Sequence, residues 1–157
     1  MQAFNTWGAQ ATTMAFGEVY TGLQQGTVDA LENPLTPIFQ NRMQEVAPYI
    51  TMTGHFYCPA PLIMAESTWN SLSSEDQQLL LDLANEYKDV EREYFKVKDA
   101  EYKEIMMGEG VTFVEADELD KKQWRDAAQP VYDQYISEKG SELQDEIQKV
   151  VDEVNSK

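Results

Sequence analysis

Apolar residues recur at helical spacing in several stretches of the chain, and the longest stretch lies near its centre. Between Ser74 and Met107 the apolar positions step alternately by three and four residues, which is the spacing of a narrow seam along one α-helix. The seam consists of Leu80, Leu83, Tyr87, Val90, Tyr94 and Val97. The stretch opens on a capping signature, SSED, and ends at Gly108 and Gly110. The sequence therefore predicts one continuous or gently kinked helix over residues 74–107.

This seam needs a covering surface. Burying a Leu, Val or Tyr side chain of this kind stabilises a protein by about 1.5 to 3 kcal/mol, so a whole seam is costly to leave in water. We expect another chain or the C-terminal helix to cover it. The first of these alternatives predicts self-association.

Shorter helical faces precede and follow the long helix. The pattern predicts helices over residues 1–7, 16–25, 35–46, 67–72, 118–135 and 141–154. Gly26 is suited to the left-handed C-terminal cap of the second of these helices. Asp117 is expected to cap the fifth, and Pro130 to kink it.

Four segments read as extended chain, at residues 11–14, 28–31, 49–65 and 111–114. Pro59 and Pro61 should divide the third segment, because proline cannot donate into a central ladder. Cys58 is expected there as a small buried residue in a strand. The pattern as a whole predicts an α/β fold with more helix than strand, in which a small mixed sheet is flanked by helices and one helix is very long.

Composition excludes some classes of partner. The 157 residues include 42% hydrophobic and 11% aromatic residues, which are ordinary values for one globular domain. Twelve Lys and Arg against 28 Asp and Glu give a net charge of −16, which argues against nucleic acid and anionic membrane surfaces as partners. The single cysteine cannot form an internal disulfide, and neither a membrane-spanning run nor an export leader is visible.

The residues show no constellation for catalysis or metal binding. His55 is the single histidine of the chain, so a multi-histidine metal site or a histidine relay cannot be built within it. A GxSxG nucleophile elbow does not accompany it. We therefore expect no enzyme and no cofactor, and a lone histidine of this kind is more often a packed structural residue.

One polar cluster stands where a predicted strand meets a predicted helix. Glu32 and Asn33 follow the 28–31 segment, and Pro34 disfavours helix at Asn33 while opening the next helix. In open α/β sheets, ligands bind at such joints. The residues alone favour a simpler alternative, in which Asn33 is only an N-cap and Glu32 a surface charge.

Two separated motifs carry a family resemblance. The runs are GAQATTMAFGEVYTGLQQGTVDALENP and, further on, TGHFYCPAPLIMAESTWNSLSSEDQQLL. In this order and spacing they resemble the solute-binding subunit of tripartite ATP-independent periplasmic (TRAP) transporters, in the dicarboxylate-binding-protein family. Weaker similarity continues to about Tyr135. The resemblance covers only the C-terminal part of that family, so the first lobe and the start of the second are expected to be absent.

The resemblance implies the second lobe of a type II periplasmic-binding-protein fold. It also implies an intact parent that captures an organic acid in the periplasm and delivers it to membrane permease subunits. On this basis we expect residues 1–65 to form the sheet and the ligand side of the lobe. Residues 66–110 would form a long spanning helix, and residues 111–157 a short strand and the C-terminal helices. The alternative is an acidic α/β interaction domain that self-associates through its long helix.

Four residues match ligand positions of that family. By resemblance, Phe16 lies against the ligand near its carboxylate, and Asn33 donates its side-chain amide to a carboxylate oxygen. Glu32 matches a position that contacts the polar end of the ligand in some members. His55 matches a position in a polar network beside the ligand in members that bind sugar acids. An amide donor and an aromatic wall give a carboxylate both orientation and a dry surrounding.

The family's principal carboxylate anchor has no counterpart here. Its members grip the carboxylate with an arginine on the strand before the helix that ends near Trp7, because a guanidinium can bind both oxygens at once. The chain contains Arg42, Arg92 and Arg125, and none matches that position. We therefore expect half a site, and feeble binding of organic acids by this chain alone.

Overall fold

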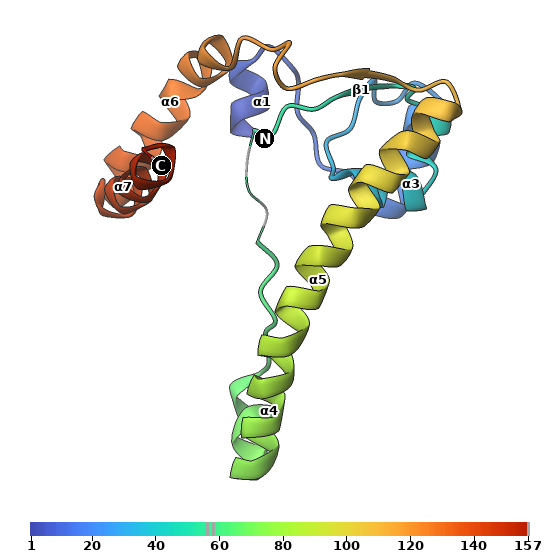
Figure 1. Ribbon diagram of the computed structural model, residues 1–157. Helices are drawn as coiled ribbons and strands as arrows, with labels where there is room; N and C mark the ends of the chain where they lie inside the picture. The colour runs from blue at the N-terminus through green and yellow to red at the C-terminus, as the bar shows by residue number, and fades with distance from the viewer. Residues whose placement is uncertain (56, 58, 157) are drawn as a thin grey trace. The chain divides into compact units, whose positions relative to one another are not determined.

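The computed structural model describes residues 1–55, 57 and 59–156 of the chain (Figure 1). These residues cluster into two compact units. The central unit is Ala15–Ala116, and the terminal unit combines Met1–Met14 with Asp117–Lys157. The three segments expected from the sequence divide the chain differently, and they stay a prediction.

The central unit surrounds a short parallel sheet. Its helices and strands are η1 (Phe16–Glu18), α2 (Val19–Gln24), α3 (Leu35–Gln40), η2 (Met43–Glu45), β1 (Tyr49–Thr51), α4 (Glu66–Ser71), α5 (Ser74–Gly108) and β2 (Thr112–Val114). Strands β1 and β2 pair in parallel with Ile50 opposite Phe113. The predicted predominance of helix over strand is confirmed for the described residues, and so is the strand after Gly110.

Helix α5 confirms the long helix predicted from the apolar seam. It runs without interruption for 35 residues, and the Ser73 hydroxyl accepts a hydrogen bond of 3.1 Å from the Asp76 amide at its start. At its end Gly110 adopts φ +94°, and the Val111 amide donates back to the Met106 carbonyl at 3.0 Å. A side-chain cap at one end and a glycine turn at the other thus set its limits.

The core of the central unit lies where α3 packs against the C-terminal end of α5, as Figure 1 shows. Phe39 stacks on Tyr102 with ring centroids 4.3 Å apart, and the Thr36 hydroxyl donates to Asp99 Oδ1 at 2.7 Å. Met106 is the most completely buried side chain described, at 0% exposure. The buried cluster is Leu23, Leu35, Ile38, Met43, Met106 and Val111. This packing fixes the start of α3, which Pro34 separates from Glu32 and Asn33.

The apolar seam of α5 lies on the surface of the structure. Its six side chains, Leu80, Leu83, Tyr87, Val90, Tyr94 and Val97, are between 36% and 64% exposed. Only the C-terminal third of the helix contributes to the core described above. The expected covering of the seam by another chain or by the C-terminal helix stays a prediction.

Two of the predicted strands are absent, although every residue in them is described. Residues 11–14 and 28–31 form no ladder, and one amide in each segment bonds locally. The Ala11 amide donates to Asn5 Oδ1 at 3.0 Å, and the Val28 amide to the Gly22 carbonyl at 3.4 Å. The sheet of the described residues is therefore two-stranded and parallel rather than mixed.

The segment 49–65 contains less strand than expected. Only Tyr49–Thr51 pairs as β1, and the described residues from 52 to 65 form an irregular connection that leads to α4. Leu62 and Ile63 are exposed in this connection. The expectation for Cys58 lies outside the described residues.

Two helix predictions need correction. The single helix expected over residues 35–46 is broken, because Arg42 adopts a left-handed φ of +56° between α3 and η2. The sixth α-helix, α6 (Lys121–Lys139), is capped by Asp120, whose Oδ1 accepts from the Gln123 amide at 3.0 Å. Asp117 is therefore not its cap. By contrast, Gly26 has the expected left-handed conformation, with φ +70°.

The terminal unit is helical. It contains α1 (Gln2–Thr6), α6 and α7 (Glu142–Asn155), and Pro130 lies inside α6. Helix α1 packs on α6 through Trp7, whose ring lies 4.7 Å from that of Trp124 and whose Nε1 donates to the Trp124 carbonyl at 2.9 Å. Among the described residues, no helix has the length and apolar character that crossing a membrane requires.

Candidate functional site

The structure brings together two of the four predicted site residues, Glu32 and His55. Glu32 lies just before α3, and His55 lies four residues after the end of β1. His55 Nε2 is 4.0 Å from Glu32 Oε1. The His55 side chain is 17% exposed and the Glu32 side chain 40% exposed. The pair is thus a partly buried polar corner with one side open to solvent.

Thr53 is a third member of this corner that the sequence reasoning missed. Its Oγ1 lies 2.8 Å from His55 Nδ1, a good hydrogen-bond distance. The sequence alone carried no signal for this contact, because a threonine two residues before a histidine is ordinary. Gly54 between them adopts φ +53°. The ring of His55 is therefore held from its Nδ1 side while its Nε2 side faces Glu32.

Asn33 lies directly beside this corner in the chain. It is half-buried, and the residue at the N-cap of α3 is Pro34, with no side chain capping the helix. The simpler alternative for Asn33, that it serves only as an N-cap, is therefore wrong. Its role as an amide donor stays a prediction.

Phe16 begins the short η1 helix in the same unit, and its ring is 45% exposed. An exposed aromatic ring can form an apolar wall for a ligand. Its expected position beside the ligand carboxylate stays a prediction.

Each of the three arginines has a partner outside the set Glu32, Asn33 and His55. Arg42 Nε lies 3.4 Å from Glu45 Oε1, and this side chain is 76% exposed. Arg92 Nη1 lies 3.9 Å from Asp89 Oδ1 on α5, and Arg125 Nη2 donates to Gln148 Oε1 at 3.1 Å in the terminal unit. None of these pairs includes Glu32, Asn33 or His55.

Glu45 also accepts a hydrogen bond of 3.2 Å from the Tyr20 hydroxyl. Desolvation, followed by this hydrogen bond, raises the pKa of Tyr20. Glu45 therefore holds both Arg42 and Tyr20.

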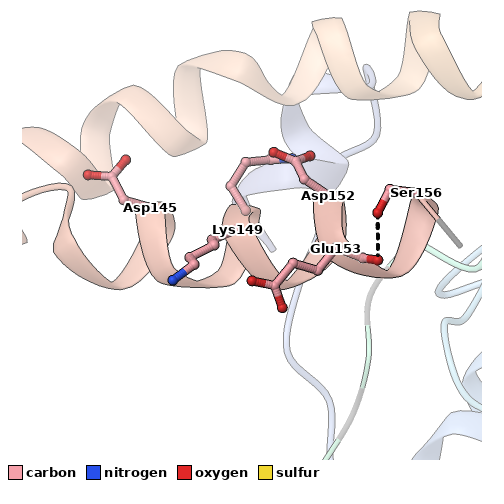
Figure 2. A pocket seen from close by; sticks show the side chains of 6 residues that line it. Asp145, Lys149, Asp152, Glu153 and Ser156 are labelled. Atoms are coloured by element: carbon pink, nitrogen blue, oxygen red, sulfur yellow. Dashed lines mark hydrogen bonds between the residues drawn. The ribbon is translucent and has the colours of Figure 1, made fainter.

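A shallow groove lies on α7 in the terminal unit. Figure 2 shows that its labelled side chains, Asp145, Lys149, Asp152, Glu153 and Ser156, all project from this single helix. The Ser156 hydroxyl donates to the Glu153 carbonyl at 3.0 Å. Within the described part of the chain, no group of three or more His, Cys, Asp or Glu side chains could hold a metal ion. The groove is thus a solvated acidic helix face.

Residues 1–139 match the family of bacterial extracellular solute-binding proteins, family 7. The chain belongs to this family. It is 34% identical over 145 residues to a solute-binding protein of Verminephrobacter eiseniae, and the aligned region covers 92% of this chain and 43% of that protein. It is 32% identical over 155 residues to the 2,3-diketo-L-gulonate-binding periplasmic protein YiaO of Escherichia coli. This aligned region covers 97% of this chain and 45% of that protein.

Solved structures show the same fold. A TRAP periplasmic solute-binding protein from Chromohalobacter salexigens, with bound D-glucuronate, is similar with a TM-score of 0.87 and 31% identity. The similarity covers 96% of this chain and 49% of that structure. The family 7 chain described here thus has the fold of part of a TRAP solute-binding protein, and it spans less than half the length of each of these three relatives.

Proposed function

We propose that this family 7 chain is part of a solute-binding subunit that captures an organic acid for a TRAP-type transporter. Its partners would be that acid and the permease subunits in the membrane, and its location would be the periplasm. The observation that carries the proposal is the family match over residues 1–139. Its structural similarity to proteins with bound D-glucuronate or galacturonate supports it.

The family resemblance suggests a role for each predicted residue in this proposal. Asn33 would donate to the acid's carboxylate from the end of the loop that α3 fixes in place. Glu32 and His55 form the adjoining polar corner, with Nε2 and Oε1 4.0 Å apart. Phe16 would supply an apolar wall. Bidentate contacts from a guanidinium are strong carboxylate anchors. The three arginines of this chain pair with Glu45, Asp89 and Gln148 instead. The proposed site therefore needs a further group to anchor the carboxylate.

Calorimetry tests this proposal. D-glucuronate, D-galacturonate and succinate would each be titrated into the 157-residue chain. They would also be titrated into a chimera, in which the N-terminal part of the Chromohalobacter salexigens protein precedes residue 1. We expect binding heat from a uronate in the chimera and little or none with residues 1–157 alone, because the family's arginine and a wall that excludes water would be supplied by the added part. Tight binding by the chain alone would refute the half-site expectation, and no acid binding to a folded chimera would refute the proposed function.

The exposed seam of α5 favours a second candidate function, self-association with a second copy of this chain. Seven acidic and two basic residues lie between Ser74 and Glu93, whereas three of each lie between Tyr94 and Gly108. An antiparallel pair would place each acidic half against the more balanced half of its partner. A parallel pair would oppose two acidic halves, which is unfavourable. The charge pattern therefore favours an antiparallel dimer.

Sedimentation equilibrium tests this dimer. At high micromolar concentration the chain should sediment as a dimer, and Val90→Glu should shift it to monomer because a charge in the seam cannot be desolvated cheaply. Glu91→Gln, one position away and off the seam, is the matched control and should remain dimeric. A wild-type chain that stays monomeric throughout this range would remove the second candidate.

A further inference from the structure

Two side-chain contacts fasten α3 to α5, and they lie one helical turn apart on both helices. In the first, the Thr36 hydroxyl donates to Asp99 Oδ1 at 2.7 Å. In the second, Phe39 stacks on Tyr102 with ring centroids 4.3 Å apart and ring planes 20° apart. Each residue of the second contact follows its counterpart in the first by three positions, and residues three apart are neighbours on a helix surface. The two contacts therefore lie on one line along which α3 meets α5.

The polar contact is the more specific of the two. Aromatic pairs are favourable over a wide range of centroid separations, about 4.5 to 7 Å, whereas an O–H···O hydrogen bond spans only about 2.5 to 3.0 Å. Thr36 is 3% exposed, so water has little access to its hydroxyl. The hydrogen bond from Thr36 to Asp99 therefore sets the register of α3 on α5, while the stacked rings add burial.

The acceptor in this contact is a carboxylate on a half-buried residue. Lys103, one turn beyond Asp99 on α5, is paired with another carboxylate, and its Nζ lies 2.5 Å from Glu115 Oε1. Asp99 accepts from the neutral hydroxyl of Thr36 instead. Hydrogen bonds with one ionised partner are shorter and stronger than those between neutral groups. The contact is therefore suited to hold one end of α3 firmly.

The chain between Asn33 and Thr36 has little freedom. The ring of Pro34 restricts its φ, which is −59°, and the Leu35 side chain is 6% exposed in the buried cluster. Helix α3 has no side-chain cap and no acidic residue in its first turn, so contacts from outside the helix hold its start. A shift of α3 along α5 would therefore move Asn33 with it.

We propose that Asp99 is a positioning residue, which acts through Thr36 to hold the side-chain amide of Asn33 where it meets the carboxylate of the ligand. This inference rests on the proposed function for its ligand. Asp99 need not touch the acid, because its effect passes through the first turn of α3. Binding by Asn33 thus depends on a residue of α5 that lies 66 positions further along the chain.

Calorimetry of the chimera tests the effect on binding. Thr36→Val and Asp99→Ala should each weaken D-glucuronate binding about tenfold, because both remove the hydrogen bond that places the amide. Thr36→Ser keeps the hydroxyl and should bind nearly as tightly as the unmodified chimera. Asp89→Ala is the matched control, since Asp89 lies on the same helix with a side chain that is 75% exposed, and it should leave the affinity unchanged.

A double variant separates positioning from a general loss of stability. In a chimera that already carries Asn33→Ala, Asp99→Ala should weaken binding by less than about twofold, because the amide that it positions is gone. A full further tenfold loss would mean that Asp99 acts by another route, and the inference would be overturned. Unchanged affinity in folded chimeras that carry Thr36→Val or Asp99→Ala would overturn it as well.

Nitrogen-15 NMR of the 157-residue chain tests the positioning without any ligand. The side-chain amide signals of Asn33 are identified by their absence from the spectrum of Asn33→Ala. They should shift in Thr36→Val and in Asp99→Ala, and should return to their wild-type positions in Thr36→Ser. The signals of Asn85, which is exposed on α5, should stay in place in every variant and serve as the reference.

Circular dichroism would verify that each variant is folded. If Asp99→Ala does not fold, Thr36→Val decides the question, because valine and threonine have nearly the same shape. Asn33 signals that stay at their wild-type positions in a folded Thr36→Val chain would overturn the positioning role. A chimera that binds no acid would refute the proposed function, whereas these spectra would still decide whether Asp99 and Thr36 position Asn33.

Discussion

Met106→Ala should lower the free energy of unfolding of the chain by about 2 to 5 kcal/mol. The Met106 side chain is 0% exposed and belongs to the buried cluster between α3 and α5. Its removal would leave a cavity in the contact that holds the start of α3. Because domains of this kind are stable by only about 5 to 15 kcal/mol, this single change should remove a large part of the stability of the central unit. Urea unfolding followed by circular dichroism measures it.

Met107→Ala is the matched control, because the neighbouring methionine on the same helix is 55% exposed. Its effect should be within about 0.5 kcal/mol, as is usual for surface substitutions. Equal loss in the two variants would mean that the α3–α5 contact is not the core of the unit.

Features of the fold that depend on neighbouring residues could be predicted from the sequence. The limits of α5 follow from the Ser73 cap and from Gly110, both of which act within a few residues. Gly26 could be predicted as a left-handed cap for the same reason. The break at Arg42 could not, because a left-handed arginine is rare.

Strands proved harder, because a strand exists only where its backbone groups find a partner. The apolar pattern suggested strands at residues 11–14 and 28–31, but neither forms a ladder, and one amide in each, that of Ala11 and that of Val28, bonds locally to Asn5 and to Gly22. Strands β1 and β2 pair with each other. Ile50 lies opposite Phe113, although more than sixty residues separate the two in sequence. Nothing in a single strand's own residues reports whether such a partner exists.

The candidate site was partly predictable. Resemblance pointed to Glu32 and His55, and the structure places them in one corner. Thr53 was missed because threonine in an extended segment is ordinary, and only the 2.8 Å contact with His55 gives it a role. The covering of the α5 seam could not be predicted from this chain, since an apolar face does not specify what lies on it.

Asn33→Ala should reduce the affinity of the chimera for D-glucuronate by about 10- to 100-fold. Asn33 is half-buried beside Glu32, and Pro34 rather than Asn33 is the N-cap of α3, so its amide is not required for capping. A hydrogen bond to a charged group is worth about 1.5 to 3 kcal/mol, and a tenfold change in affinity corresponds to about 1.4 kcal/mol. Calorimetry of the variant chimera measures the loss directly.

Asn85→Ala is the control, because Asn85 is exposed on α5 and far in sequence from the corner. It should bind as tightly as the unmodified chimera. The Asn33 variant should also unfold at nearly the same urea concentration as the unmodified chimera, which separates lost binding from lost folding. Unchanged affinity in a folded Asn33→Ala chimera would show that the ligand's carboxylate is held without this amide, and the role of Asn33 would fail even though the family and the fold stand.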